Sequence, residues 1–224
     1  ERMFEAGAHF GLSRSRRHPS AKSAIFGAKN GIEIIDLEKT TAHLALAKEF
    51  VATLSRTGKK ILFVGTKSEG RKIVEEGASS IEMPYVHNRW LGGTLSNFPQ
   101  MKKRILHMED LITKRTGGLL DKYTKKERLL IDREIAKLEK NFAGLAVMKE
   151  LPAALFVVDA KKEHIAVAEA KSMGIPVVSI SSSDCDFSKI AYPIPANDAS
   201  GTSIAFFVKE ITSAWKEGKS VTTN

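Results

Sequence analysis

The sequence predicts an α/β protein: a doubly wound parallel sheet of the Rossmann or flavodoxin-like kind, with an inserted antiparallel helical coiled-coil hairpin. Apolar runs of strand length recur along the chain, and each is followed by a segment with the spacing of an amphipathic helix. One interval, residues 99–150, breaks this alternation and shows helical spacing alone. We therefore expect a globular α/β domain made of residues 1–98 and 151–224, interrupted by a helical hairpin at 99–150.

The globular domain is predicted to begin with short elements. Residues 24–37, AIFGAKNGIEIIDL, read as two short strands around a turn, and residues 37–58 read as a helix that ends at Gly58. Downstream, the apolar runs ILFVG, ALFVVDA and PVVSIS start at residues 61, 154 and 176, and each leads to a helical pattern. Because these runs are almost continuously apolar, we expect parallel strands that are covered on both faces.

The hairpin is recognised by two narrow apolar seams. In each seam the apolar side chains are spaced by four, three and four residues, which places them on one face of a helix. The first seam is Met101, Ile105, Met108 and Ile112, and the second is Ile131, Ile135, Leu138 and Phe142. The glycine-containing segment TGGLLDKYT joins them. The other faces are heavily charged, so we expect the hairpin to project from the globular domain.

The charge of the chain favours a polyanion as partner. Its 224 residues include 35 Lys plus Arg and 26 Asp plus Glu, a net charge of +9. The excess is concentrated: residues 1–30 hold six basic and two acidic side chains, 56–72 six and one, 87–104 four and none, and 114–128 six and two. Solvated basic loops are the plainer interpretation, but a patterned excess is more informative than a uniform one.

The sequence also argues against several classes of protein. A single cysteine, Cys185, permits no internal disulfide and no cysteine-based zinc site, and it suits a reducing compartment. No apolar run approaches the roughly 18 residues of a membrane span, and the first residues do not resemble a signal peptide. The six histidines never occur in a metal-binding spacing. We therefore expect no bound metal, no cofactor and no membrane association.

One segment, GTKSEGRK at residues 65–72, nearly matches the phosphate-binding loop of nucleotide hydrolases. Arg71 stands where that loop needs a lysine, and Lys72 stands where it needs a hydroxyl group for magnesium. The serine-rich segment SISSSDCD, residues 179–186, lies at the carboxyl end of a predicted strand, but no base accompanies its serines in the sequence. We therefore predict that the protein is not an enzyme and has no catalytic residue.

Two segments combine basic side chains with glycine. Residues 87–98, HNRWLGGTLSNF, offer the Arg89 guanidinium and the Trp90 ring for stacking, although packing of Trp90 in the core explains that residue equally well. Residues 11–31 carry arginines and lysines among serines and glycines, and Pro19 predicts an extended loop there. We expect these and neighbouring side chains to contact RNA. The expected RNA-binding residues are Arg14, Arg16, Arg17, His18, Lys22, Lys29, Lys67, Arg71, His87, Asn88, Arg89, Trp90, Lys102, Lys103 and Arg104.

Six motifs cover nearly the whole chain in a recognisable order. They are AGAHFG (6–11), IFGAKNGIEIIDLEKT (25–40), ILFVGTK (61–67), HNRWLGGTLSNF (87–98), YTKKE (123–127) and PAALFVVDAKKEHIAVAEAKSMGIPVVSI (152–180). Together they resemble the bacterial-type small-subunit ribosomal protein "S two" family. The resemblance implies a doubly wound α/β domain with an inserted helical hairpin, bound to small-subunit ribosomal RNA near the head–body junction and supporting translation. It also implies recruitment of the large ribosomal protein "S one".

The sequence departs from the family pattern in two places. Leu12 stands where relatives commonly have histidine, and Ser182, Ser183 and Asp184 stand where they often have Asp-Thr-Asn. Some relatives hold a metal ion with that histidine and nearby carboxylates, so no metal is expected here, and recruitment of "S one" is left open. The implied partners are small-subunit ribosomal RNA and neighbouring small-subunit proteins, with no homo-oligomer. The implied location is a ribosome of the cytoplasm, with an organellar ribosome as the alternative.

Two functions of other classes stay open from the residues alone. A nucleotide- or nucleotide-sugar-binding α/β enzyme would use the carboxyl edge of the sheet near Ser181 and Asp184, and a free protein–protein adaptor would act through the hairpin. Cofractionation with small ribosomal subunits separates a ribosomal protein from both.

Overall fold

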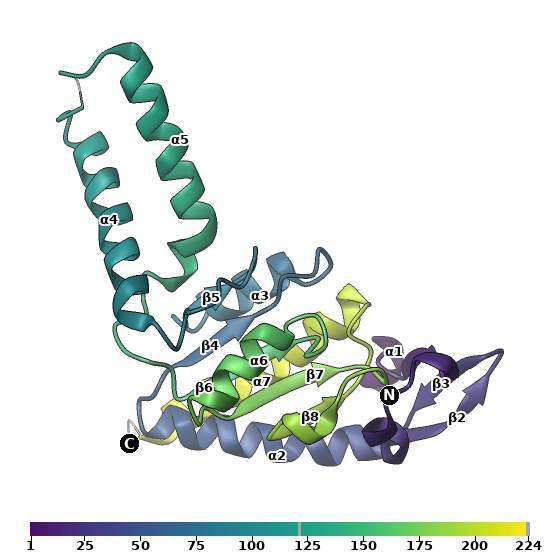
Figure 1. Cartoon of the computed structure of the whole chain (residues 1–224). Helices are drawn as coiled ribbons and strands as arrows, with labels where there is room; N and C mark the ends of the chain where they lie inside the picture. Colours follow the sequence, from purple (N-terminus) through teal and green to yellow (C-terminus); the bar gives the residue numbers. More distant parts are fainter. Residues whose placement is uncertain (121, 223–224) are drawn as a thin grey trace.

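The centre of the protein is a five-stranded parallel sheet, seen in a computed structural model that describes residues 1–120 and 122–222 (Figure 1). Its strands, in the order β5-β4-β6-β7-β8, are all parallel to their neighbours. They are β4 (Ile61–Val64), β5 (Tyr85–Val86), β6 (Ala154–Val158), β7 (Val177–Ser181) and β8 (Tyr192–Pro195). Taken in chain order this is 2-1-3-4-5, the order of flavodoxin-like folds. The predicted α/β class with a parallel sheet is therefore confirmed.

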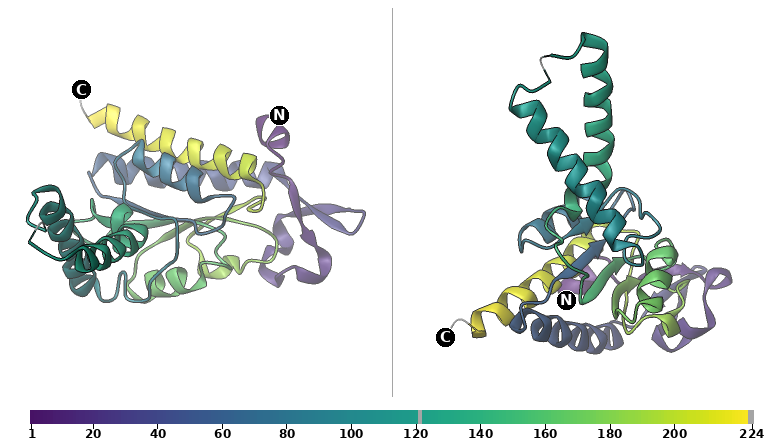
Figure 2. Two further views of the ribbon diagram at one scale, coloured as in Figure 1. Left: turned by 90° about the horizontal axis from the view of Figure 1, so that it is seen from above. Right: turned by 60° about the vertical axis from the view of Figure 1, so that its left-hand side comes forward.

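Helices cover both faces of this sheet. Helices α2 (Leu37–Arg56), α3 (Arg71–Ser79) and α7 (Gly201–Thr222) lie on one side and α6 (His164–Ser172) on the other (Figure 2, left). Successive strand residues alternate between the two layers: Phe63 packs with the first set of helices, and Leu62 packs with α6. This double covering explains why β4 and β6 are apolar at every position, while β7 also buries Ser179 and Ser181.

A second, smaller sheet lies near the amino terminus, after the short helix α1 (Arg2–Glu5). Its strands β1 (Phe10–Ser13), β2 (Ile25–Lys29) and β3 (Ile32–Ile35) are antiparallel in the order β1-β3-β2. The predicted pair of strands around a turn is confirmed, because Asn30 and Gly31 both have positive φ, 52° and 77°, as a tight two-residue hairpin requires.

The prediction of an extended loop over residues 11–31 is wrong. Besides β1 and β2, this segment contains two 3-10 turns, η1 (Arg14–Arg16) and η2 (Pro19–Ala24). The ring of His18 accepts a hydrogen bond from the backbone of Ser20 at the start of η2, where Pro19 already has a suitable φ. Local capping therefore gives structure to a segment that has no apolar periodicity.

Two helices, α4 (Phe98–Thr116) and α5 (Lys125–Phe142), lie side by side and extend away from the central sheet (Figure 1). Helix α5 begins at a capping box in which Thr124 and Glu127 bond each other's backbone. The seam residues Ile105, Met108, Ile135 and Leu138 are buried. Packing of the pair as a coiled coil stays a prediction.

The base of this helical pair belongs to the core of the sheet. Ile105, Met108, Leu138 and Phe142 form one apolar cluster with strand residues such as Leu62, and the turn η3 (Ala143–Leu145) continues it. The seam thus serves two purposes: it joins the helices to each other and joins their base to the globular part.

None of the helices in the described part of the chain combines the length and the apolar character that a membrane span requires.

Candidate nucleic-acid interface

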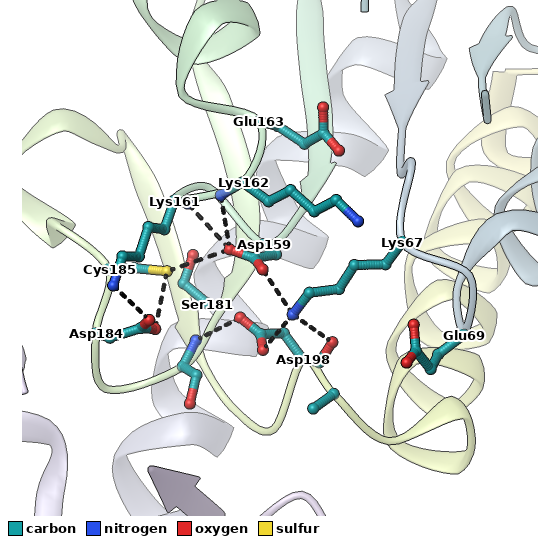
Figure 3. A network of polar contacts seen from close by, with 12 residues as sticks. Lys67, Glu69, Asp159, Lys161, Lys162, Glu163, Ser181, Asp184, Cys185 and Asp198 are labelled. Atoms are coloured by element: carbon teal, nitrogen blue, oxygen red, sulfur yellow. Dashed lines mark hydrogen bonds and ion pairs between the residues drawn. The ribbon is translucent and has the colours of Figure 1, made fainter. Parts of the chain in front are cut away.

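The carboxyl edge of the central sheet is the place where doubly wound folds usually bind ligands, and here it is closed by an ion-pair network (Figure 3). Lys67 follows β4 and Asp159 follows β6, so the two residues meet where the strand order reverses. The Nζ of Lys67 lies 2.6 Å from Oδ2 of Asp159 and 2.9 Å from Oδ1 of Asp198. The same Nζ donates to the backbone carbonyl of Asp198 at 3.1 Å. One ammonium group therefore ties together three loops.

The acids of this network are held by further donors. The backbone amide of Ser182 donates to Oδ2 of Asp198 at 3.0 Å, and the amides of Lys161 and Lys162 donate to Oδ1 of Asp159. Burial raises the pKa of Asp198 to about 6, and repulsion by Asp159 adds to this effect. Burial also acts to lower the pKa of Lys67, but the charges of Asp198 and Asp159 outweigh it, and that pKa is raised. The charged groups of this network are thus bonded to partners inside the protein.

The loop that resembles a phosphate-binding loop is also satisfied internally. Oε1 of Glu163 accepts hydrogen bonds from both the backbone amide and the hydroxyl of Thr66, where a phosphate would need to accept them. The Nε of Arg71 donates to the Thr66 carbonyl at 3.0 Å. A carboxylate in this position repels a nucleotide phosphate. We expected Lys67 to contact RNA; its ammonium is bound by two carboxylates inside the protein, and the RNA contact stays a prediction.

The same edge holds the only group of possible metal ligands found among the described residues: Asp159, Cys185 and Asp198, whose ligand atoms lie within 4.8 Å of one another. These side chains do not fit a metal ion. Burial raises the pKa of the Cys185 thiol to about 12, so the thiolate is disfavoured, and the Lys67 ammonium already lies between the two carboxylates. Leu12 offers no side-chain donor, although its amide bonds the Ser183 hydroxyl at 3.2 Å. The expectation of no bound metal stays a prediction.

The glycine-rich segment 87–98 folds around a single acid from α6. Oε2 of Glu169 accepts from Nε1 of Trp90 at 3.0 Å and from the amide of Gly93 at 3.3 Å. Oε1 accepts from the amides of Leu95 and Ser96, at 2.9 and 2.8 Å, and from the Ser96 hydroxyl at 2.8 Å. Burial alone would raise the pKa of Glu169, but these hydrogen bonds, led by those from Ser96, lower it. Glu169 therefore fixes the loop as an ionised acceptor.

This arrangement corrects the expectation for Trp90. Its side chain is only 6 % exposed and packs in the apolar cluster that contains Leu62 and Leu95. A ring in that position presents no face to a base, so of the two interpretations of Trp90 the structure supports packing in the core. Its neighbour Arg89 is exposed, His87 is half-buried, and Asn88 donates to the Asn141 side chain at 3.0 Å. Within this segment Arg89 is the side chain best placed for an external partner.

The basic residues of the amino-terminal segment are arranged differently. Arg14, Arg16, Lys22 and Lys29 are exposed. Arg17 is half-buried, and its guanidinium donates to Glu33 at 3.0 Å. The His18 ring bonds the Ser20 hydroxyl at 2.8 Å and lies 3.8 Å from the Asp186 carboxylate. The first four residues are thus available to a partner, while Arg17 and His18 also have internal roles.

The remaining expected residues lie near α3 and α4. Arg71 is exposed at the start of α3, and Lys102, Lys103 and Arg104 are exposed in the first turns of α4. The amino-terminal sheet and the α4–α5 pair lie at opposite ends of the molecule (Figures 1 and 2). Of the expected RNA-binding residues, those of the amino-terminal segment and those on α4 therefore lie in two separate places on the protein.

Three important residues are not predicted by the sequence patterns. Glu169 and Asp198 organise their surroundings, but no spacing or charge pattern in the sequence indicates these roles, and Phe26 is a highly exposed aromatic. Only Phe26 has a usable signal, because it lies in a predicted strand between basic residues.

The ligand crevice of this α/β protein is closed by its own ion pairs, and exposed basic residues lie outside it, on the amino-terminal segment and on α4. These features suit a protein that binds a polyanion without catalysis. The sequence matches the family model described as "Ribosomal protein S2" over residues 3–218. The chain belongs to this family; it is a structural ribosomal protein and not an enzyme.

Bacterial relatives agree with this assignment. The chain is 45 % identical over 219 residues to the small ribosomal subunit protein uS2 of Sulfurimonas denitrificans, covering 98 % of this chain and 85 % of the relative. The uS2 protein of Desulforapulum autotrophicum is 45 % identical, with 96 % and 77 % covered. That of Chlorobaculum tepidum is 44 % identical, with 99 % and 89 % covered.

Proposed function

We propose that this protein is a constituent of the cytoplasmic small ribosomal subunit that binds small-subunit ribosomal RNA near the head–body junction. The observation that carries the proposal is the division of the basic residues. Lys67, in the ligand crevice, is neutralised by internal acids, while Arg14, Arg16 and Lys102 are exposed outside it. A nucleotide enzyme needs the opposite arrangement. Exposed arginines and lysines suit RNA phosphates, which position a protein without reading base sequence.

The helical pair is part of this proposal as a distinct binding element. Its amino-terminal turns carry Lys102, Lys103 and Arg104, all exposed, on a pair that extends from the sheet (Figure 1). We expect the pair to reach RNA that the globular part does not touch. Because Met108 and Leu138 at its base belong to the sheet's apolar cluster, only the outer part should be removable. Deleting about residues 109–134 with a short linker should leave a cooperative unfolding transition, whereas deleting about residues 102–147 should not.

Protein partners complete the proposal. We propose contacts with neighbouring small-subunit proteins, no homo-oligomer, and recruitment of the large ribosomal protein "S one", which the family resemblance implies. Sedimentation of the purified chain tests its oligomeric state. Small subunits assembled with and without this chain, then mixed with "S one", test the recruitment, and equal retention of "S one" by both would reject it.

The main experiment measures incorporation into small subunits. The chain should sediment with small subunits at moderate salt and dissociate from them at high salt, because counterion release makes phosphate contacts salt-dependent. A matched pair of variants locates the contact: Arg14→Gln/Arg16→Gln should weaken incorporation, and Lys209→Gln/Lys216→Gln on α7, with the same change in charge, should not. A chain that stays free of subunits but gains thermal stability from nucleotides would contradict the proposal.

A further inference from the structure

Phe26 in β2 is the most exposed large apolar side chain among the described residues. Its exposed fraction is 80 %, compared with 62 % for Phe4 and 60 % for Leu119. Exposing the apolar area of an aromatic ring to water is unfavourable, so a partner that covers this ring gains free energy. Neither the ion-pair network nor the packing of the two sheets uses this ring.

The backbone explains why this ring stands out from the sheet. Ile25 is paired with Ile35, and Gly27 is paired with Ile34, the next residue of β3. Phe26 is therefore the extra residue of a β-bulge. A bulge leaves one residue outside the regular ladder and changes the direction of its side chain. The sequence Ile-Phe-Gly thus holds an aromatic ring away from the small sheet.

Phe26 lies in a stretch of sequence that is rich in positive charge. Residues 14–35 contain five arginines and lysines and one acid, Glu33. Glu33 is 1 % exposed and paired with Arg17, so it does not offset the outer charges. Lys22 and Lys29, on either side of Phe26 in sequence, are exposed. A partner for this surface needs negative charge together with a flat apolar face.

We propose that Phe26 stacks on an unpaired base of RNA while Lys22 and Lys29 contact the adjacent phosphates. An unpaired nucleotide is the partner that supplies both chemistries, and aromatic residues of strands are common stacking platforms for single-stranded RNA. The proposal rests on the proposed ribosomal RNA binding, and it assigns to Phe26 the stacking role that the buried Trp90 cannot have.

The test compares three substitutions at one position, with binding to small-subunit ribosomal RNA measured at several salt concentrations. Phe26→Ala should weaken binding by roughly 5- to 150-fold, the range observed for loss of one stacked base. The salt dependence should not change, because no charge is removed. Phe26→Leu should bind nearly as weakly as Phe26→Ala, since leucine is apolar but cannot stack, whereas Phe26→Trp should bind at least as well as the original chain. Leu46→Ala, at a 57 % exposed apolar position on α2, is the control and should bind normally.

A spectroscopic measurement follows the same contact directly. Trp90 and Trp215 are 6 % and 5 % exposed, so the Phe26→Trp variant carries one exposed indole beside two buried ones. RNA should quench the exposed emission if a base stacks on that ring, and an unchanged spectrum at saturating RNA would overturn the proposal.

The outcomes separate this proposal from the proposed function. If the original chain does not bind the RNA, the proposed function fails. If the original chain binds and Phe26→Ala binds equally well, only the stacking proposal is overturned. Normal RNA binding by Phe26→Ala without incorporation into subunits would also overturn it, since the ring would then contact a protein.

Discussion

Two segments with similar composition, residues 10–35 and residues 87–98, fold in opposite ways. Both combine basic residues, glycine and an aromatic. In residues 87–98 the Trp90 ring is buried and the loop closes on Glu169. In residues 10–35 the Phe26 ring is exposed, and the acid Glu33 bonds an arginine rather than the backbone of a loop. The Trp90 ring is thus held in the core by a hydrogen bond to Glu169, whereas the β-bulge at Phe26 leaves that ring outside the small sheet.

The difference in anchoring has an electrostatic reason. Glu169 accepts three backbone amides, a hydroxyl and an indole, so one negative charge gathers neutral donors and leaves Arg89 outside. Such charge-assisted hydrogen bonds are stronger than neutral ones. Without an equivalent acid, the turns around Arg14 and Arg16 leave their guanidinium groups exposed.

Of the substitutions considered, Trp90→Ala should lower the free energy of unfolding the most. A small effect would contradict the assignment of Trp90 to the core and of Phe26 to the surface. Removing a buried aromatic ring leaves a cavity, and such substitutions cost about 3–5 kcal/mol. Chemical denaturation should show this loss, while Phe26→Ala should change the unfolding free energy by less than about 0.5 kcal/mol. Equal stability of the two variants would mean that Trp90 is not part of the core.

Glu169→Gln should have the next largest effect on stability, about 2 kcal/mol near neutral pH, because an amide group replaces an acceptor that faces several donors. The pKa of Glu169 is lowered by folding, from an ordinary value of 4.5. Its contribution is therefore present above that value and is lost as the pH falls through the lowered folded value. The difference in stability between the original chain and Glu169→Gln should shrink in acid. A difference that does not depend on pH would show that Glu169 does not act as an ionised acceptor.

Arg17→Gln should cost somewhat less, about 1–2 kcal/mol, because it leaves the buried Glu33 carboxylate without its guanidinium partner. Arg14→Gln, three residues earlier and exposed, is the matched control and should stay within about 0.5 kcal/mol of the original chain. Thermal unfolding of the two variants separates the structural arginine from its exposed neighbour, and equal melting temperatures would remove the distinction.

The main elements of the fold could be predicted from sequence because each has a local signal. Long apolar runs mark β4, β6 and β7, and the Asn-Gly pair marks the β2–β3 hairpin. Strand β5 is not predicted because it has two residues, and β8 is not because its sequence, YPIP, contains two prolines. A proline lacks the amide that a central strand needs, but β8 lies at the edge of the sheet, where that amide is dispensable.

The site was harder to predict, because its geometry depends on distant partners. Trp90 and its acceptor Glu169 are 79 residues apart, and Lys67 and Asp198 are 131 residues apart. A basic residue that is bound by a distant acid looks, in sequence, the same as one that is free. Exposure could be predicted for Arg14 and Arg16, which have no apolar neighbours to cover them, but the ion pairs of Lys67 with distant acids could not.

Arg14→Gln/Arg16→Gln should change the stability of the protein least. This double variant is also the most direct test of whether the two exposed arginines contact RNA. Arg17 is left in place because its pairing with Glu33 would add a folding effect to the binding effect. Removing one phosphate-binding side chain should flatten the log–log salt dependence of binding by about 0.7 for a single-stranded partner. Two such removals therefore predict a slope that is flatter by about 1.4, with an unchanged unfolding transition and equal decreases in affinity for ribosomal and unrelated RNA.

Arg89→Gln, from the segment of residues 87–98 that is anchored by Glu169, should flatten the slope by about half as much. If the double variant keeps the full salt slope while Arg89→Gln reduces it strongly, the anchored loop rather than the amino-terminal turns faces the RNA, and the assignment of the two segments is reversed.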